Sequence, residues 1–588
     1  MSKRFASIDF LRGLAILLMV FVHTFMRWID RDTVQSNIND YRLIILWLML
    51  GLIFIGAWAG FFLMVSAAGN MISMYKGVEK SGKVGDMVLK QVLGGTLLLF
   101  CGVLVESVLG YHAALGELVL GKNDWWTHIF YRGYHMETIH AIAWCIILNG
   151  IIQGILSING GWKKINRNII IYSILAIVVI VGTVFVWQGV RTLLPGYPFA
   201  DRVVDIFGVS KNLDIQYGVL GVDPFFELVW KFFLIPLAGK HEPIFPFLAI
   251  SFIGSIIGLF LMRKQQEMEE NKPVSTKLLK YGMIIGLVLF VIGLIGTGLF
   301  VIQRPSAIDN IILPHHFDVI HMYVEGLESY GSDFVFGFIP FSFIWLPWFL
   351  MVTGAQFGAI CLILRTVEFR GKSKPFGRKT RYFRRYGFVA FSIYAYQFVD
   401  ILAVYLLTLI PWFPSLTWSS YFGSVPENMF DVYQIWPLLI LIFVIYEILI
   451  RFWEKAHFTL GYEWFIAKIA GVVIPSQRKL KKKEGFFRTI RLDVNGGIYN
   501  PEWIEIVPGE SVHTSLADSK LSGKLCWIGI FIPPISFVSL GIASNSMKTE
   551  GKNKYNKRGL IVSLIGLGIA VSIFIASFFL PISALGLF

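Results

Sequence analysis

Charged residues are scarce in this chain, and their scarcity excludes a set of water-soluble domains. Only 15% of the 588 residues are charged, whereas 55% are hydrophobic, and the mean hydropathy is +0.65. Soluble globular domains carry about 25% charged residues. The composition therefore indicates a polytopic membrane protein that lies in a lipid bilayer.

Cysteine is also rare, and familiar catalytic motifs are absent. The four cysteines lie singly inside apolar runs, which predicts neither a disulfide framework nor a metal site. They are Cys101, Cys145, Cys361 and Cys526. The sequence has no Walker loop, dinucleotide fingerprint or Gly-x-Ser-x-Gly elbow, which argues against an ATP-driven pump and a serine esterase. The histidines of 315–321 match no strong metal motif, so no metal is predicted.

Long apolar runs, in contrast, are abundant. A helix needs about 20 residues to cross a hydrocarbon core about 30 Å thick, and about ten such runs precede residue 455. They fall near 10–27, 44–68, 90–111, 136–157, 168–188, 244–262, 279–302, 339–363, 386–410 and 432–450, and two more fall near 525–544 and 560–583. Continuous runs are typical of membrane helices, because strands of closed barrels alternate apolar and polar residues. The predicted fold class is all-α: a polytopic bundle of about ten transmembrane helices with a C-terminal two-helix module.

The net charge of +14 is concentrated in alternate connections between the apolar runs. "GGWKKINRN" and "RTVEFRGKSKPFGRKTRYFRR" are rich in Lys and Arg, whereas residues 411–430 contain neither. A nucleic-acid partner would need a continuous basic stripe, so none is predicted. The positive-inside rule instead predicts a multi-pass protein of the cell membrane with a cytoplasmic N-terminus.

Changes in composition divide the chain into three predicted parts. Residues 1–470 form the main transmembrane domain, residues 471–523 form a basic linker with a small soluble insert, and residues 524–588 form the two-helix membrane module. The loop inside the last part is basic, which conflicts with the positive-inside rule if 525–544 crosses the membrane. Pro533-Pro534 leaves a re-entrant hairpin open as the alternative.

The stretch "IDFLRGLAILLMVFVHTF" places three polar residues in the first apolar run. Arg12 and His23 are eleven residues apart, which is about three turns plus 20°, so they share one helix face about 16 Å apart. Asp9 precedes Arg12 by three residues and is predicted to pair with its guanidinium. Arg12 alone could snorkel to head groups, and His23 alone could make a packing hydrogen bond. Their shared face instead predicts a lined pathway through the membrane.

These residue types suit acyl transfer between two compartments. Arg12 presents a planar fork of donors that matches phosphate, and His23 can accept a proton near neutral pH. In the fourth run, Glu137 precedes His140 by three residues and could orient its imidazole. A packing hydrogen bond is the alternative for His140. Further buried polar residues without a predicted role are Glu106, Gln397 and Asp400.

The chain also resembles a known family. "IDFLRGLAILLMVFVHTFMRW" is similar to the opening helix of membrane acyltransferases related to heparan-alpha-glucosaminide N-acetyltransferase, and it shares the Arg-ten-residues-His pattern of the wider transmembrane acyltransferase superfamily. "AGFFLMVSAAGNMIS", "METIHAIAWCIIL", "HEPIFPFLAISFIGSIIGLFL" and "FTLGYEWFIAKIAG" resemble later motifs of these families. The resemblance covers about residues 5–470. It implies transfer of an acyl group, typically acetyl from cytosolic acetyl-CoA, to an amine or hydroxyl of a sugar across the membrane.

The matching positions imply roles for individual residues. Arg12 would serve the CoA end, His23 would serve the chemistry, and His140 occupies the position of the family's His-Ile motif. The lysosomal enzyme's catalytic histidine lies in the loop after its first helix, whereas this chain has no histidine between Thr24 and Tyr111. This departure favours the broader Arg/His arrangement over the heparan activity.

The sequence therefore predicts an acyl-CoA-dependent membrane acyltransferase. Acetyl-CoA or another acyl-CoA would bind at Arg12 and Asp9, and a sugar or lipid-linked glycan would be the acceptor. His23 would be the general base, or an acyl carrier, with His140 and Glu137 assisting. The alternatives are a transporter or flippase that uses the same polar path, and an inactive scaffold or sensor.

Overall fold

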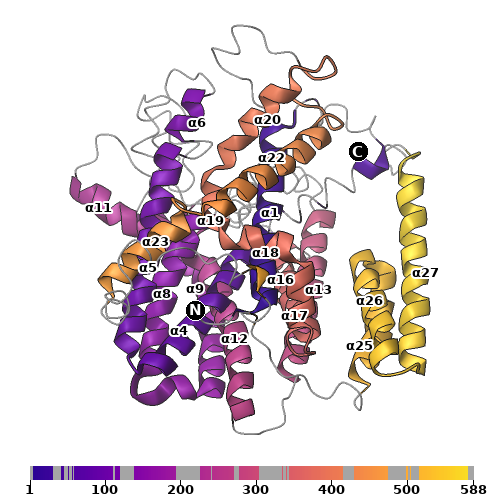
Figure 1. Ribbon diagram of the computed structural model, residues 1–588, viewed down its shortest axis with the longest axis horizontal. Coiled ribbons are helices and arrows are strands. Elements are labelled where there is room, and N and C mark those ends of the chain that lie inside the picture. Colours follow the sequence, from indigo (N-terminus) through magenta and orange to yellow (C-terminus); the bar gives the residue numbers. More distant parts are fainter. Residues whose placement is uncertain are drawn as a thin grey trace.

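The structure is a computed structural model of the chain, and its regular structure is almost entirely helical (Figure 1). It describes residues 4–30, 58–109, 113–119, 138–193, 225–239, 242–269, 277–303, 343–414, 429–474, 498–500 and 516–580, with short pieces at 33, 42–45, 51, 54, 56, 334–335, 339–340 and 504. The predicted all-α fold class is confirmed for this part of the chain.

Nine helices of the described residues are long and apolar enough to cross a membrane, which makes the chain a multi-pass membrane protein. They are α1 (Ala6–Trp28), α5 (Val84–Leu104) with its π-helical end η2 (Val105–Leu109), α8 (Thr138–Ser157) with the 3-10 turn η5 (Ile158–Lys163), α9 (Ile165–Leu193), α12 (Ile244–Glu269), α13 (Lys277–Gln303), α16 (Trp345–Val367), α22 (Ile435–Lys455) and α27 (Lys554–Ser577). The run predicted at 44–68 lies only partly in the described residues. Its described part continues into α4 (Ala59–Ser81), which is not among the nine.

The remaining elements are short. They are α6 (Ala114–Val119), α11 (Phe225–Leu234), η7 (Ile235–Leu237), β1 (Phe334–Val335), β2 (Ile339–Pro340), α17 (Ser373–Lys379), α18 (Arg381–Phe388), α19 (Ala390–Ala395), η9 (Gln397–Val399), α20 (Asp400–Leu407), α23 (Tyr462–Val473), α25 (Ala517–Phe531) and α26 (Pro533–Thr549). The two strands pair antiparallel, with Phe334 opposite Pro340. Helix α25 begins inside the stretch predicted as linker and soluble insert.

The predicted span at 386–410 is wrong, because the chain there is not one helix. Helices α18, α19 and α20 and the turn η9 replace it, and we call Arg381–Leu407 the broken segment. The backbone leaves helical geometry at Val389 (φ −125°, ψ 35°) and at Tyr396 (φ −99°, ψ 26°). Irregular backbone at membrane depth needs protein partners for its polar groups. The hydroxyl of Tyr446 supplies one by donating to the Tyr396 carbonyl oxygen (3.1 Å).

Residues 525–544, for which the sequence left a span and a re-entrant hairpin open, form a hairpin. Helices α25 and α26 meet at Ile532, directly before two prolines. The 15 residues of α25 reach about 22 Å, which is less than a hydrocarbon core of about 30 Å. The Glu550 carboxylate accepts the backbone N–H groups of Asp518 (2.9 Å) and Ser519 (2.9 Å), so both ends of the hairpin lie together. This geometry fits the re-entrant alternative and removes the conflict between the two basic segments.

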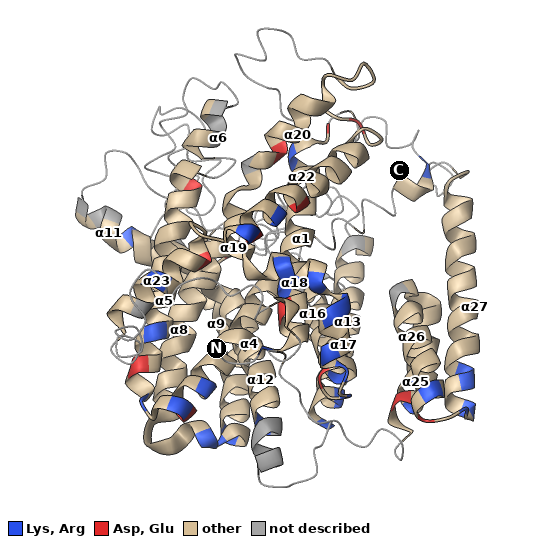
Figure 2. Ribbon diagram, viewed as in Figure 1, with Lys and Arg blue, Asp and Glu red and all other residues tan. Residues whose placement is uncertain are grey.

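One end of the bundle, which we call the basic end, is where α16 ends and where α25 and α27 begin. There Asp518 forms ion pairs with Arg365 (3.2 Å) and Arg370 (3.0 Å). Figure 2 shows Lys and Arg gathered around α17 and at the starts of α25 and α27. Helix α1 starts at the same end, because Ser7 binds Glu368 directly after α16.

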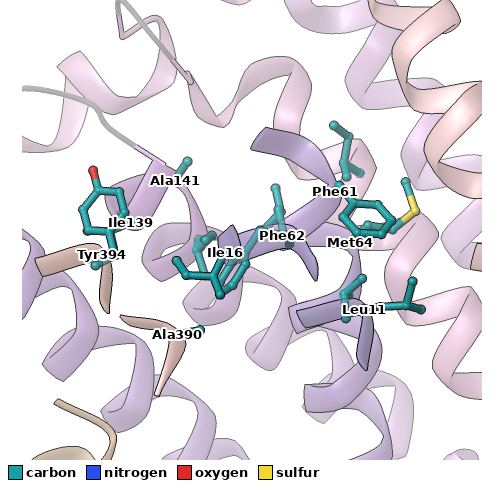
Figure 3. Packing of buried hydrophobic residues seen from close by; sticks show 14 of the residues in the cluster. Leu11, Ile16, Phe61, Phe62, Met64, Ile139, Ala141, Ala390 and Tyr394 are labelled. Atoms are coloured by element: carbon teal, nitrogen blue, oxygen red, sulfur yellow. The ribbon is translucent and has the colours of Figure 1, made fainter. Parts of the chain in front are cut away.

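Helix α1 lies inside the bundle, in contact with α4, α16, α17, α18, α19 and α22. Its crossing with α18 requires glycine on both helices. A Cβ at Gly13 would overlap the Phe383 carbonyl oxygen, and one at Gly387 would overlap the Asp9 carbonyl oxygen. Figure 3 shows the buried apolar side chains of α1, α4, α8 and α19 in this part of the core. The polar face of α1 is thereby set against the broken segment.

Candidate intramembrane polar site

The first turns of α1 are held by ion pairs, and Asp9 is their centre. The Asp9 side chain is 5% exposed and binds Arg4 (Nη2 to Oδ1, 2.7 Å). Arg384 of α18, which is 1% exposed, forms a second ion pair with Asp9 at 3.6 Å. Arg4 and Arg384 are thus the ion-pair partners of Asp9, for which Arg12 had been the predicted partner. The reason is geometric: Arg4 folds back from the chain before α1, and α18 crosses α1 next to Asp9.

A second carboxylate, Glu368, binds the start of α1 from the other side. Its Oε1 accepts the backbone N–H (2.9 Å) and the hydroxyl (2.6 Å) of Ser7, and its Oε2 accepts the hydroxyl of Ser373 (2.6 Å). One buried side chain thus serves the first turns of both α1 and α17. Burial raises the pKa of Glu368, and the hydrogen bonds from Ser373 and Ser7 oppose that shift.

Arg12 lies one turn beyond Asp9 and faces the broken segment. A Cβ at Gly387 of α18 would lie 3.3 Å from the Arg12 Cβ. The Arg12 Nε is buried and has no hydrogen-bond partner among the described residues. Three charged side chains interact electrostatically with the Arg12 guanidinium: Arg4, Asp9 and Glu463. Its guanidinium therefore keeps donor capacity that an anionic group could use.

Glu463 of α23 closes the break between α18 and α19. Its Oε1 accepts the backbone N–H of Phe391 (2.7 Å), and its Oε2 accepts the hydroxyl of Ser392 (2.5 Å). Burial raises the pKa of Glu463 above its usual value. The hydrogen bonds from Ser392 and Phe391 and the charge of Arg12 oppose this rise without cancelling it. The same carboxylate thus binds the broken backbone and faces Arg12.

His23 contacts the broken segment further along α1. Its Nδ1–H donates to Gln397 Oε1 (2.9 Å), and the Gln397 amide nitrogen lies 3.6 Å from the Met19 sulfur. The His23 ring stands edge-on to the ring of Tyr394, with centroids 6.5 Å apart. A bond from Nδ1 to an amide oxygen places the lone pair of the neutral imidazole on Nε2. The shared face predicted for Arg12 and His23 is therefore the face that meets the broken segment.

Tyr394 extends this arrangement to a third helix. Its hydroxyl donates to Glu106 Oε1 (3.1 Å). Glu106 lies in the π-helical turn η2, and such turns often occur at functional sites. We call His23, Gln397, Tyr394 and Glu106 the His23 network. It joins α1, the broken segment and the end of α5.

His140 lies on α8 near the same part of α5. It is 2% exposed, and a Cβ at Gly102 of α5 would lie 3.4 Å from its Nε2. Gly102 precedes Glu106 by one turn. Glu137, the predicted partner of His140, lies outside the described residues. Among the described residues, the structure brings two carboxylates to this region: Glu106, and Glu242, whose Oε1 accepts the hydroxyl of Thr138 two residues before His140 (2.8 Å).

A buried ion pair joins the C-terminal end of α1 to α20. Arg27, 2% exposed, binds Asp400, 5% exposed, at 3.3 Å. The indole N–H of Trp28 donates to the other Asp400 oxygen (2.8 Å). Asp400, which had no predicted role, therefore pairs with a charge from α1.

Sequence reasoning missed Tyr394, Arg27, Arg384 and Glu463 as members of these clusters. Tyr394 could have been found from the polar side chains that recur inside the run at 386–410. The mean hydropathy of that run conceals them. The others come from segments far apart in the chain, so no local pattern could link them to α1.

Among the described residues, no group of three His, Cys, Asp or Glu side chains could hold a metal ion. The histidines of 315–321 lie outside those residues.

No family model matches the sequence, and no curated protein matches it. The resemblance to membrane acyltransferases therefore stays a prediction.

Proposed function

We propose that this chain is an integral membrane acyltransferase. It moves an acyl group, acetyl in the simplest case, from cytoplasmic acyl-CoA to a hydroxyl or amine of a sugar or lipid-linked glycan on the opposite side of the cell membrane. The observation that carries the proposal is the orientation of His23, whose Nδ1 proton is bound by Gln397. In a neutral imidazole held in this way the lone pair lies on Nε2, which is therefore the proposed base.

The proposed reaction uses two groups of α1. Arg12, near the basic end, binds a phosphate of acyl-CoA with its free donor capacity. His23 lies about 16 Å further along the helix, so the pantetheine arm would bring the thioester towards it. Asp9 supports this site indirectly by holding Arg4 and Arg384.

The chemistry at His23 is a general-base transfer. Nε2 takes a proton from the hydroxyl or amine of the acceptor. At the same time the oxygen or nitrogen atom of the acceptor attacks the thioester carbon. The carbon–sulfur bond breaks, and the imidazolium returns the proton to the leaving thiolate. The Tyr394 hydroxyl beside His23 is the proposed donor to the carbonyl oxygen: as that oxygen gains charge, the hydroxyl proton turns to it from Glu106 Oε1. Glu106 and His140 assist from α5 and α8 by positioning that hydroxyl.

One observation favours transport as a second candidate. The broken segment lies at the polar face of α1, and discontinuous helices often form substrate sites in transporters. A transporter would bind its substrate there without consuming acyl-CoA. Turnover of the thioester therefore separates the two functions.

The test is binding and turnover of radiolabelled acetyl-CoA by the full chain in lipid nanodiscs. We expect Arg12→Ala to lose binding, and His23→Ala to keep binding but lose hydrolysis and transfer. Arg378→Ala, which removes an exposed arginine of α17, is the matched control and should behave as wild type. Wild-type protein that is folded but shows no saturable binding of acetyl-CoA or longer acyl-CoAs would contradict the acyltransferase and favour transport.

A further inference from the structure

A small cavity with both apolar and polar lining lies between α4, α8, α9 and α12, apart from the His23 network. Its volume is about 20 Å³. Polar side chains that line it are Tyr75, Gln153, Ser157, Asn168 and Tyr172. None of its lining residues is charged. The cavity therefore suits a small neutral ligand that forms hydrogen bonds.

Two of the lining groups lack a hydrogen-bond partner among the described residues. They are Gln153 Oε1 and the Tyr172 hydroxyl. Gln153 is 3% exposed and Tyr172 is 1% exposed, so bulk solvent cannot serve them. A buried polar group without a partner is costly, and native proteins rarely retain one. One acceptor and one hydroxyl thus meet at the same cavity.

Asn168, another polar side chain that lines the cavity, has its own bonds made. It donates to the Gly161 carbonyl oxygen (3.1 Å) and accepts from Arg167 (2.9 Å). Asn149, one turn along α8, donates to Ser255 Oγ (2.7 Å); its Oδ1 also lacks a partner among the described residues, but Asn149 does not line this cavity. Among the described lining residues, the buried side-chain atoms without a partner are therefore Gln153 Oε1 and the Tyr172 hydroxyl.

We propose that one internal water molecule binds in this cavity. The water donates a hydrogen bond to Gln153 Oε1 and accepts a hydrogen bond from the Tyr172 hydroxyl. It thereby links α8 to α9. One water needs a cavity of about 10–15 Å³, and the volume of this cavity is sufficient. The same volume is too small for a sugar, a phosphate or a nucleotide. The water is a structural ligand of α8, the helix that carries His140 at its other end. This inference does not depend on the proposed function.

The test is X-ray radiolytic footprinting of the full chain in nanodiscs, read by mass spectrometry. A bound water is a local source of hydroxyl radicals, so Tyr172 should be oxidised several-fold faster than its low exposure implies. Tyr446 is the matched control, because it is 4% exposed and its hydroxyl is bound to the Tyr396 carbonyl. Equal, slow oxidation of Tyr172 and Tyr446 in wild type would overturn the proposal.

The variant Gln153→Leu removes the acceptor for the water. Oxidation of Tyr172 should then fall to the level of Tyr446, and an unchanged rate would overturn the proposal. If the variant does not fold, the wild-type comparison still decides. A density map of the wild type should also show a peak within hydrogen-bond reach of Gln153 Oε1 and the Tyr172 hydroxyl, and an empty cavity in a map that resolves other internal waters would contradict it.

Discussion

The two ends of the "IDFLRGLAILLMVFVH" stretch lie in different polar environments. At its start, Asp9 is bound by two arginines and Ser7 by Glu368. At its end, His23 is bound by a neutral amide and faces a tyrosine ring. A cluster of paired charges fixes helices, because removing one charge leaves the others uncompensated. A neutral histidine whose Nδ1 carries the proton has its basic lone pair on Nε2.

The broken segment contributes to both environments. Its first helix supplies Arg384 to the ion-pair cluster, and its 3-10 turn supplies Gln397 to the His23 network. The difference between them predicts that variants in the first lower stability, whereas variants in the second change chemistry.

Asp9→Leu should cause the largest loss. It leaves Arg384 buried without its carboxylate, and breaking a buried pair costs about 3–5 kcal/mol. Thermal unfolding in nanodiscs and the yield of monodisperse protein measure this effect. Glu79→Gln, which neutralises an exposed carboxylate, is the matched control and should not change either value. Wild-type stability in Asp9→Leu would show that the cluster does not hold α1.

Glu368→Gln should cause a smaller loss, about 1–2 kcal/mol. The amide keeps the shape of the side chain but replaces charge-assisted hydrogen bonds to Ser7 and Ser373 with neutral ones. Thermal unfolding measures the loss, and Ser373→Ala should lower stability in the same direction. A more stable Glu368→Gln protein would contradict this role.

Acid should loosen the C-terminal hairpin by protonating Glu550. Burial opposes ionisation of Glu550, but the hydrogen bonds from Ser519 and from the backbone of Asp518 outweigh it, so its pKa lies below 4.5. Because the folded pKa is lowered, the stabilisation is present above pH 4.5 and is lost as the pH falls through the folded value.

Spin labels at Lys520 and Lys548, on the two arms of the hairpin, measure this change. Their distance distribution should broaden at acidic pH in wild type, and it should be broad at every pH in Glu550→Gln. A narrow distribution in Glu550→Gln would show that the carboxylate does not join the arms.

His23→Gln should have the smallest effect on stability, about 1 kcal/mol, because its hydrogen bond to Gln397 joins two uncharged groups and no buried charge is left uncompensated. Its effect on acyl transfer should be large, since general-base catalysis contributes about 100-fold or more. Thermal unfolding and transfer rate, measured on one sample, separate the two. A loss of stability as large as that of Asp9→Leu would assign His23 to the scaffold.

The fold class was predictable from the sequence, because each long apolar run must cross or enter the bilayer. The breaks at Val389 and Tyr396 were not, because hydropathy averages over the polar residues of that run. Pro533-Pro534 did indicate the hairpin as an alternative.

The site was predictable only in part. The helical period correctly placed Arg12 and His23 on one face of α1, which the structure sets against the broken segment. The partners of Asp9 were not predictable, because Arg384 follows it only after many intervening helices. Glu106 was visible as a buried carboxylate, but only the fold brings it to Tyr394.

The most direct test of the contrast between the two clusters is single-turnover acyl transfer from labelled acetyl-CoA, normalised to folded protein, in wild type, Glu368→Gln and His23→Gln. The account predicts that Glu368→Gln transfers at the wild-type rate per folded molecule, whereas His23→Gln binds acetyl-CoA but transfers about 100-fold more slowly or not at all. Equal rates in wild type and His23→Gln, or no transfer by folded wild type with any sugar or glycan acceptor, would contradict it.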